Sequence, residues 1–349
     1  MAWNKLDRVM AALSGEIPDR TPIFEYMIND SVFEHYLGRS LIPGEREAII
    51  KGCSKCLDVC HPMSTVYEPH EEILTDGTRR VYERWMAWNI APKRDINEMA
   101  KSIKKEIEQL EGRVITKEDL AKWKEDEARY KAWAEDMVYI SVSSSASILP
   151  GNIEESAYLF ADYPDLCKKW NKTANLANLE WLDAISTGCL APVAIIWNDI
   201  AIKNTLLYSP ALLDELFFPW LNEMVSMLHS KGVKVIFHSD GDVSSVFNQL
   251  AASGIDGFNP LEITAGMNVE HFYDKYGKKV ALVGGMDAVD DLAFGTPESV
   301  LAATKKLIQK AWKKGSFIAA SSSGEIDNSM PFENVMAYFE AVWNYNIIL

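Results

Sequence analysis

The sequence predicts a single-domain α/β protein of the (β/α)8-barrel class, and three observations support this prediction. The chain has 349 residues, a length that suits one large barrel domain. Short apolar segments typical of buried strands alternate with segments typical of helices, and eight strands can be placed along the chain. No G-x-G-x-x-G motif follows any of these strands, so a dinucleotide-binding fold has little support.

The expected strands are short, mostly apolar runs, separated by helical or loop sequence. They lie at 23–27, 63–67, 138–142, 193–197, 233–237, 257–260, 280–284 and 317–320. Helices are expected at 6–13, 210–231, 243–252, 269–276 and 297–313. The helix at 6–13 precedes the first strand and is therefore an N-terminal helical extension of the barrel.

Residues 98–136 do not follow the alternation of strands and helices. This stretch is strongly charged and contains scattered aromatic residues such as Trp123 and Trp133. A run of charges usually marks a solvated helix face, so we expect surface helices here. They would form a helical excursion from the barrel or a lid over it.

Composition restricts the classes of function. The formal net charge is −15, and such a surface repels nucleic acid and anionic lipid. The chain has neither an apolar run of about 18 residues nor the apolar segment of a signal peptide. We therefore expect a cytoplasmic protein that does not span a membrane.

Three of the five cysteines have the spacing C-x2-C-x3-C, at Cys53, Cys56 and Cys60. This spacing has two interpretations. The cysteines could ligate a metal cluster, or they could be small apolar residues on the buried face of a helix over 45–60, together with Ile49. The recurrence at three or four residues favours the helix, because spacing alone is weak evidence for a cluster.

The most informative segment is His238-Ser-Asp240-Gly, which follows the apolar run 233–237. His238 and Asp240 are two residues apart, so on an extended strand end both side chains point to the same face. The carboxyl ends of barrel strands are where active sites lie. The pair therefore predicts half of a metal site or a proton-transfer site. The alternative is a structural Asp-Gly turn with a polar histidine beside it.

Other polar residues follow the remaining strands and would meet His238 and Asp240 at one end of the barrel. They are Glu25, Tyr26, Ser143, Ser145, Asn198, Asp199, Glu262, Asp287, Ser321, Ser322, Ser323 and Glu325. Each of them singly could equally be a helix cap or a turn residue. Together they predict one acidic, polar site.

The chain resembles the uroporphyrinogen decarboxylase superfamily, and within it the methyltransferases that work with corrinoid proteins. The resemblance runs over nearly the whole length, and its motifs are specific through their order and spacing. They lie at 17–22, 197–201, 208–210, 218–219, 237–241, 254–262, 282–287, 295–298 and 331–335. The superfamily fold is a TIM barrel, which matches the strand pattern.

Two departures from the superfamily bear on the activity. Its decarboxylases carry an Arg-Gln-Ala-Gly-Arg-Tyr segment whose arginines hold the porphyrinogen carboxylates, whereas residues 24–29 here read FEYMIN. Its thiol methyltransferases bind zinc through His-x-Cys and a later cysteine, whereas this chain has His238, Asp240 and the segment SSSGE at 321–325. Porphyrinogen decarboxylation is not expected. A metal, if bound, would have an oxygen-rich ligand set of His238, Asp240, Glu262 and Glu325, and zinc is left open.

The resemblance and these departures together suggest a methyltransferase that moves a methyl group from an O-methylated, aromatic donor to a corrinoid. No cobalamin-binding Asp-x-His-x-x-Gly motif occurs, so the corrinoid would be carried by a separate protein. The catalytic residues would be His238, Asp240 and Asp199. Contacts to the small-molecule donor would come from Glu25, Tyr26, Trp197, Asn198, Ser143 and Ser145, with Trp85 and Trp88 as further stacking candidates.

Two other functions stay open on the sequence. One is a decarboxylase or lyase of the same superfamily that acts on a smaller, non-porphyrin substrate, with Asp199 or Asp240 as the acid. The other is a binding barrel without catalysis. A homodimer is compatible with the acidic surface, and no residue pattern demonstrates it.

Overall fold

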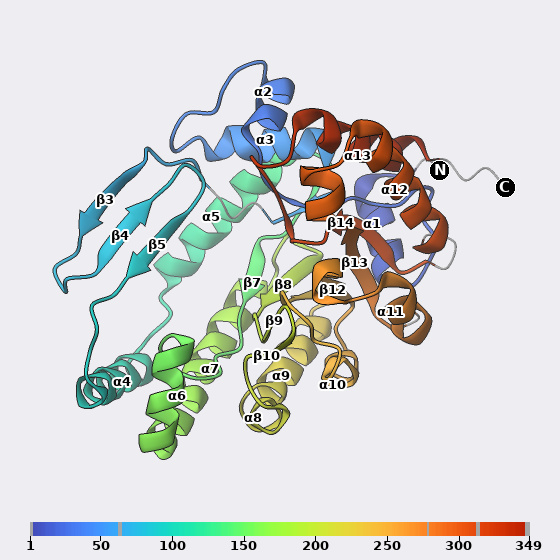
Figure 1. The fold of residues 1–349 in the computed structure, drawn as a ribbon. Coiled ribbons are helices and arrows are strands. Elements are labelled where there is room, and N and C mark those ends of the chain that lie inside the picture. The colour runs from blue at the N-terminus through green and yellow to red at the C-terminus, as the bar shows by residue number, and fades with distance from the viewer. Residues whose placement is uncertain (1–2, 62–64, 278, 312–314, 346–349) are drawn as a thin grey trace.

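Eight parallel strand positions form a closed ring in the computed structural model, which describes residues 3–61, 65–277, 279–311 and 315–345 (Figure 1). Six strands make one hydrogen-bonded sheet, in the order β14 (Phe317–Ser321), β13 (Ala281–Met286), β12 (Gly257–Asn259), β11 (Lys234–His238), β8 (Val193–Trp197) and β7 (Val142–Ser144). Just before β7 in the chain, β6 (Val138–Tyr139) pairs with β2 (Val59–Cys60). Single parallel bridges join Val59 to Phe24 and Ile23 to Ala319, ahead of β1 (Tyr26–Ile28). The predicted barrel is thereby confirmed.

The second strand position differs from the prediction. It is β2, at Val59–Cys60, rather than 63–67. Residues 62–64 lie outside the described residues, and 65–67 are not in a strand. The sequence misled here because β2 forms only a two-residue ladder, next to the buried Asp58, and a pattern so short has no period to detect.

Alternate residues of the strands fill the interior of the barrel. Phe24, Ile195, Ile236 and Val283 belong to one buried cluster, which also contains residues of helix α1 (Lys5–Leu13), Leu13 among them. A Cβ atom on Gly257 would lie only 3.1 Å from Leu13 Cδ2, so α1 packs tightly against the inner face of β12. The predicted N-terminal helix thus contributes to the barrel core.

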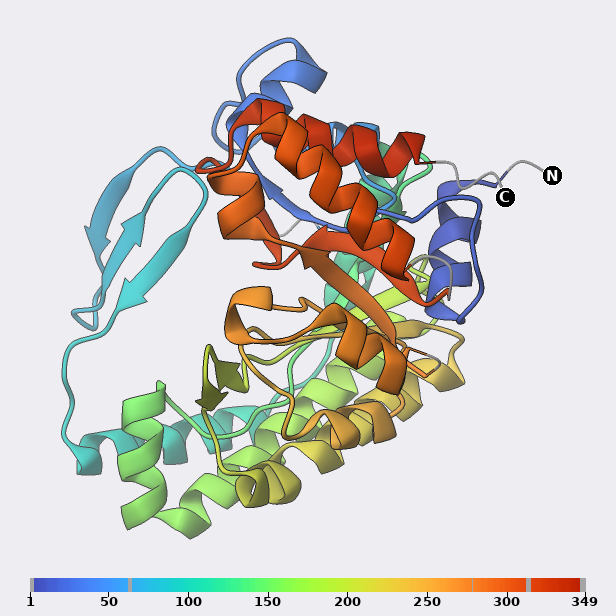
Figure 2. The ribbon, with the colours of Figure 1, turned by 45° about the vertical axis from the view of Figure 1, so that its right-hand side comes forward.

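Helices pack around the outside of the ring (Figures 1 and 2). A second and larger cluster of buried side chains includes residues of these helices and of the strands. They are α7 (Pro164–Ser186), α8 (Pro210–Leu216), α9 (Phe218–Ser230), α10 (Phe247–Ala252), α11 (Val269–Tyr276), α12 (Pro297–Ala311) and α13 (Phe332–Asn344). The helix predicted at 210–231 is divided into α8 and α9. Pro219 lies in the first turn of α9, where its missing N–H group is tolerated, so the chain starts a new helix there.

The cysteine-rich segment forms α3 (Arg46–Cys56), which follows α2 (Asp30–Leu37). Cys53 and Cys56 are buried on α3, as the helix interpretation predicts, whereas Cys60 lies on β2 beyond the end of the helix. Among the described residues no group of metal-ligating side chains includes a cysteine. Burial raises the pKa of the Cys56 and Cys60 thiols, so both stay protonated and uncharged.

Between β2 and β6 the chain leaves the barrel. The predicted excursion is helical over α4 (Ile96–Glu111) and α5 (Lys117–Trp133), and a capping box at Thr116 and Asp119 starts α5. A three-stranded antiparallel sheet, which the sequence did not predict, precedes them: β3 (His70–Ile73), β4 (Arg79–Tyr82) and β5 (Ala87–Ile90). Figure 2 shows this sheet projecting to one side of the body. Its residues are exposed or half-buried, so it has no apolar alternation strong enough to read.

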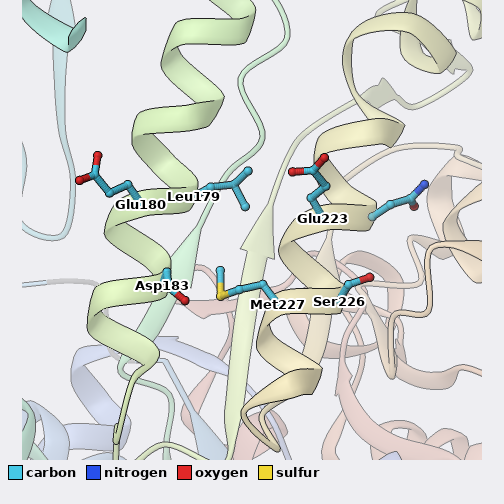
Figure 3. A pocket seen from close by; sticks show the side chains of 7 residues that line it. Leu179, Glu180, Asp183, Glu223, Ser226 and Met227 are labelled. Carbon is cyan, nitrogen blue, oxygen red and sulfur yellow. The ribbon is translucent and has the colours of Figure 1, made fainter.

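An open groove of 520 Å³ lies between α7 and α9 on the outer helices (Figure 3). Three acidic residues line it, Glu180, Asp183 and Glu223. Asp183 forms a salt bridge with Lys231, with Oδ1 and Nζ 2.6 Å apart. The groove is formed by helices rather than by strand ends. None of the described helices has an apolar stretch long enough to cross a membrane.

Candidate active site at the carboxyl ends of the strands

Four aromatic rings, called here the aromatic layer, lie at one end of the barrel. Tyr26 begins β1, just after the bridged residue Phe24, His61 follows β2, and Trp197 and His238 end β8 and β11. The rings of Tyr26 and Trp197 are stacked, with centroids 5.3 Å apart and planes inclined by 24°. His238 meets both of them edge-on, at 5.2 Å from Trp197 and 6.0 Å from Tyr26. His61 completes the layer at 5.3 Å from Trp197.

The orientation of His238 is set by its neighbours. Its Nδ1 lies 2.7 Å from Oδ1 of Asn259, and Asn259 donates through Nδ2 to the carbonyl of Val283 at 3.1 Å. Because the amide orientation is fixed in this way, Nδ1 of His238 must carry the proton and donate it. In the neutral ring the lone pair is therefore on Nε2, as in histidines that bind metals.

Nε2 of His238 faces two carboxylates. It lies 3.9 Å from Oδ1 of Asp240 and 4.0 Å from Oδ1 of Asp199. The three ligand atoms lie within 4.8 Å of one another. The Asp240 backbone N–H donates to Oδ1 of Asp199 at 3.1 Å, which holds the two carboxylates beside each other.

Asp240 is in an unusual environment. Its Oδ1 is buried and has no hydrogen-bond partner among the described residues. Burial raises the pKa of Asp240 to about 6; the His238 ring opposes this shift, and the charges of Asp199 and Glu262 add to it. Near neutral pH this carboxyl group therefore exists in both protonation states.

The donor set of His238, Asp199 and Asp240 fits a divalent metal. It supplies one imidazole nitrogen and two carboxylate oxygens, which zinc accepts in sites that keep a further position open. The orphaned Oδ1 of Asp240 and the Nε2 lone pair are both accounted for by such an ion. Protein groups behind the first ligands, here Asn259, are the usual means of orienting a metal-binding histidine.

Two residues predicted as metal ligands have other contacts. Glu262 accepts the Gly241 N–H through Oε2 at 2.7 Å and the Thr264 hydroxyl through Oε1 at 3.1 Å, so it holds the turn after β11. Glu325 lies on β15 (Glu325–Asp327), beside Tyr26 of β1. The metal-ligating group found among the described residues contains Asp199 in place of both. Of the predicted set, His238 and Asp240 therefore belong to this group, and Glu262 and Glu325 do not.

Glu325 nevertheless belongs to the surroundings of the site. Burial, together with the charges of Asp327 and Asp240, raises the pKa of Glu325. The turn before it also packs against the imidazole. A Cβ on Gly324, which has a φ of +77°, would lie 3.2 Å from Cε1 of His238. Only glycine combines this backbone conformation with so close an approach.

The structure does not place Glu25 in the site. Its side chain is fully buried, and it accepts the Ser321 N–H at 2.7 Å and lies 2.8 Å from the Ser321 hydroxyl. Burial raises the pKa of Glu25 to about 8, so this carboxyl group is mainly neutral at pH 7. Phe24 and Tyr26 both belong to the interior cluster. Because side chains alternate along an extended chain, Glu25 between them points outward. The expectation that both Glu25 and Tyr26 line the site is corrected for Glu25.

The other polar residues predicted to contact the substrate, Asn198, Ser143 and Ser145, differ in their surroundings. The Asn198 amide is occupied by both backbone groups of Ala146, at 2.8 and 3.0 Å, so it fastens the loop after β7. Ser143 is half-buried on β7 opposite Ile195, and Ser145 is exposed. Of these three residues, Ser143 alone is paired with a strand position that points into the barrel.

Three further residues named from the sequence lie elsewhere or have other contacts. Trp85 stacks on Phe33 at 5.5 Å and donates to Asp30 at 3.3 Å, and Trp88 is exposed on β5. Asp287 caps the helix η2 (Ala288–Ala293). Neither tryptophan belongs to the aromatic layer.

His61 is a site residue that the sequence analysis missed. Its Nδ1 lies 2.7 Å from the carbonyl of Ile140, which can only accept, so Nδ1 donates and Nε2 is left as an acceptor. Burial, with the positive charge of Arg46 adding to it, lowers the pKa of His61 to about 4, and the ring is neutral at pH 7. The signal was its position directly after β2, which was hidden by the wrong placement of that strand.

A methyltransferase of known structure has a similar fold. The structure of a methyltransferase from Methanosarcina mazei matches with a TM-score of 0.66 and 16% identity, over 99% of each chain. The spore cortex-lytic enzyme SleL of Bacillus megaterium matches with a TM-score of 0.44 and 11% identity, over 93% of this chain and 74% of that one. At 16% identity the likeness to the methyltransferase concerns the fold alone. No match was found among curated proteins.

The sequence itself matches a family model. The model for uroporphyrinogen decarboxylase (URO-D) covers residues 151–345, which is more than half of the chain. The matched segment includes β8, β11 and β12, and with them Asp199, His238 and Asp240. The chain belongs to the uroporphyrinogen decarboxylase family.

Proposed function

We propose that this protein is a methyltransferase that transfers the methyl group of an O-methylated aromatic compound to a corrinoid carried by a separate protein. The observation that carries the proposal is the position of the Nε2 lone pair of His238. It faces Asp199 and Asp240, while the His238 ring itself meets the stacked rings of Tyr26 and Trp197 edge-on. A polar group that can activate an ether oxygen thus lies next to a surface that can hold an aromatic ring.

Cleavage of a methyl ether requires that the leaving oxygen be stabilised as the carbon–oxygen bond breaks. A phenol leaves more readily than an alcohol because its pKa is only about 10. Asp240, whose pKa is raised to about 6, is protonated in part of the molecules near neutral pH and can donate that proton to the oxygen. An aromatic ether is therefore the donor that suits this site.

The residues present also suit a metal. Zinc held by His238, Asp199 and Asp240 would supply Lewis-acid polarisation of the ether oxygen. In that case Asn259 keeps the imidazole in the tautomer that binds, and the turn at Gly324 keeps the ring in place.

The methyl group needs an acceptor. A reduced corrinoid supplies a nucleophile strong enough to accept the methyl group, and the resemblance to corrinoid-dependent methyltransferases suggests this acceptor. Because the chain has no Asp-x-His-x-x-Gly motif, the proposal places the corrinoid on a partner protein.

The charges of the site argue against a porphyrinogen substrate. Asp199, Asp240 and Glu262 follow the neighbouring strands β8, β11 and β12, and the charge of Asp240 also acts on Glu325. A substrate with several carboxylates would be repelled by this concentration of negative charge. The family name thus does not describe the activity that we propose for this chain.

A spectral assay tests the proposal. The protein is mixed with reduced corrinoid on its carrier and a panel of methoxylated aromatics, and methylation of the corrinoid is followed by its absorbance. We expect conversion with the wild type and with His271→Ala, which alters an exposed histidine of α11, and a loss of about 10²-fold or more with His238→Ala.

The same experiment separates the rival functions. Turnover of a donor without any corrinoid would favour a lyase or decarboxylase of a smaller substrate, with Asp240 as the acid. Absence of conversion with every donor, in the presence of fully reduced carrier, would refute methyl transfer.

A further inference from the structure

Tyr26 has a feature that ring stacking alone does not explain. The side chain is 7% exposed, and its hydroxyl is buried without a hydrogen-bond partner among the described residues. Buried polar groups in folded proteins almost always have a partner, since an unmade hydrogen bond destabilises the fold. A phenylalanine would provide the same stack on Trp197 without this disadvantage.

The hydroxyl is not alone in lacking a partner at this place. Asp240 Oδ1 is also buried and unpaired among the described residues, and its charge is close enough to act on the Tyr26 hydroxyl. His238, whose Nε2 carries a lone pair, lies edge-on to the Tyr26 ring. Both unpaired groups thus border His238: Asp240 Oδ1 lies 3.9 Å from Nε2, and the Tyr26 ring meets the imidazole at 6.0 Å.

A small group that satisfies all three atoms must accept one hydrogen bond and carry a proton or a positive charge. An ether oxygen that is being protonated, or one bound to a cation, has these properties. A neutral tyrosine hydroxyl is well suited to stabilise the negative charge that develops on such an oxygen.

We infer that the Tyr26 hydroxyl donates a hydrogen bond to the leaving oxygen of the methyl donor. The inference rests on the proposed function and assigns a catalytic contact to a residue predicted only as a binding surface. The methyl carbon–oxygen bond breaks with its electron pair going to the oxygen, and the methyl group passes to the corrinoid. The phenolate formed takes its proton from Asp240, while Tyr26 keeps its own proton throughout.

The surroundings of Tyr26 favour this division of roles. Burial, followed by the nearby Cys60 thiol and the Asp240 carboxylate, raises the pKa of Tyr26 above its usual value. The hydroxyl therefore remains a neutral donor over the whole working range of pH. Its ring is fixed by Trp197 on one face and by Phe24 at 4.9 Å on its edge, so little reorganisation is needed when the oxygen arrives.

Tyr26→Phe tests the inference, because it removes the hydroxyl and keeps the ring. Tyr338→Phe is the matched control, since Tyr338 is a fully buried tyrosine of α13 outside the aromatic layer. Binding of phenols, which are the products of the reaction, is measured by calorimetry in the absence of corrinoid. We expect Tyr26→Phe to bind phenol about tenfold to hundredfold more weakly and to melt at the same or a higher temperature. Tyr338→Phe should bind phenol like the wild type.

A series of phenols separates a hydrogen bond from a merely structural effect. Phenol, 4-chlorophenol and 4-nitrophenol differ in the basicity of their oxygen, so the loss in Tyr26→Phe should change along the series. An equal loss for all three phenols would overturn the inference in favour of a structural role. Unchanged binding in Tyr26→Phe, or no binding to the wild type, would also overturn it.

The two proposals fail in different ways. Phenol binding that depends on the Tyr26 hydroxyl, in a protein that never methylates the corrinoid, would refute methyl transfer and support the contact. Methylation of the corrinoid at the same rate by Tyr26→Phe and wild type would refute the contact and support methyl transfer.

Discussion

The buried carboxylate of Asp58 allows a prediction whose size can be worked from the structure. Its side chain has no exposed surface and accepts four hydrogen bonds. One comes from Arg8 at 2.8 Å, two from Arg20 at 2.7 and 2.8 Å, and one from the backbone N–H of Ile23 at 3.0 Å. These contacts tie α1 and the loop before β1 to the start of β2.

Asp58→Asn keeps the shape of the side chain and removes its charge. The asparagine also directs an NH2 group at guanidinium donors. Arg20 then loses the carboxylate that it contacts twice, and Arg8 loses one of its two, since it keeps Asp19. Breaking a buried ion pair from one side typically costs about 3–5 kcal/mol, which is a large part of the usual 5–15 kcal/mol of folding stability. With an unfolding entropy of about 2.1 cal/mol/K per residue and 349 residues, a loss of about 4 kcal/mol lowers Tm by about 5 °C.

Urea denaturation followed by circular dichroism measures this change directly. Asp214→Asn, on the exposed surface of α8, is the control and should alter the free energy of unfolding by less than about 0.5 kcal/mol. Salt should reduce the Asp58 effect little, because the pair is buried. A loss below about 1 kcal/mol in Asp58→Asn would refute the reasoning that this network holds the amino-terminal helix to the barrel.

Three further predictions concern the site and its support. Because the pKa of Glu25 in the folded protein (about 8) is above its ordinary value of 4.5, the stability that it contributes is complete below about pH 4.5 and is lost as the pH rises to about 8. Glu25→Gln should remove this slope of at most about 1.4 kcal/mol per pH unit, and an unchanged slope in urea titrations at several pH values would contradict the burial argument. The pKa of Asp240, raised to about 6, predicts that the rate of methyl transfer falls as the pH rises above 6. The pH–rate profile of Asp240→Asn should lack this fall. A profile of the variant identical to that of the wild type would exclude Asp240 as the acid. Gly324→Ala should cost about 1–2 kcal/mol of stability, because the backbone there is left-handed. The added Cβ should also displace His238 and weaken zinc binding about tenfold or more, as measured by metal titration. A zinc affinity equal to that of the wild type would show that the turn does not position the ring.

The barrel could be predicted because the signals for it are local. Seven of the eight expected strand positions coincide closely with strands of the ring, since each carries its own apolar run. The second position failed where the ladder is only two residues long and is defined by its pairing with Phe24 and Val138. The sheet over β3 to β5 was missed for a related reason, because its residues pair with one another and not with a core.

The composition of the site depended on geometry that the sequence does not contain. Glu25 and Tyr26 are adjacent in the chain, yet one is turned to the helices and the other to the barrel interior. The Asp199 carboxylate lies near His238, whereas the Glu262 carboxylate accepts a hydrogen bond from the Gly241 N–H. His61 belongs to the aromatic layer because β2 ends at Cys60, directly before it.

The sequence by itself determined the barrel class and the pairing of His238 with Asp240, because a periodic strand followed by His-x-Asp places both side chains on one face without further information. Only the tertiary structure decided which residues of the other strands meet this pair. The stagger of the strands and the inward or outward direction of each side chain follow from hydrogen-bond register between segments far apart in the chain, and register is a property of the closed ring rather than of any one strand.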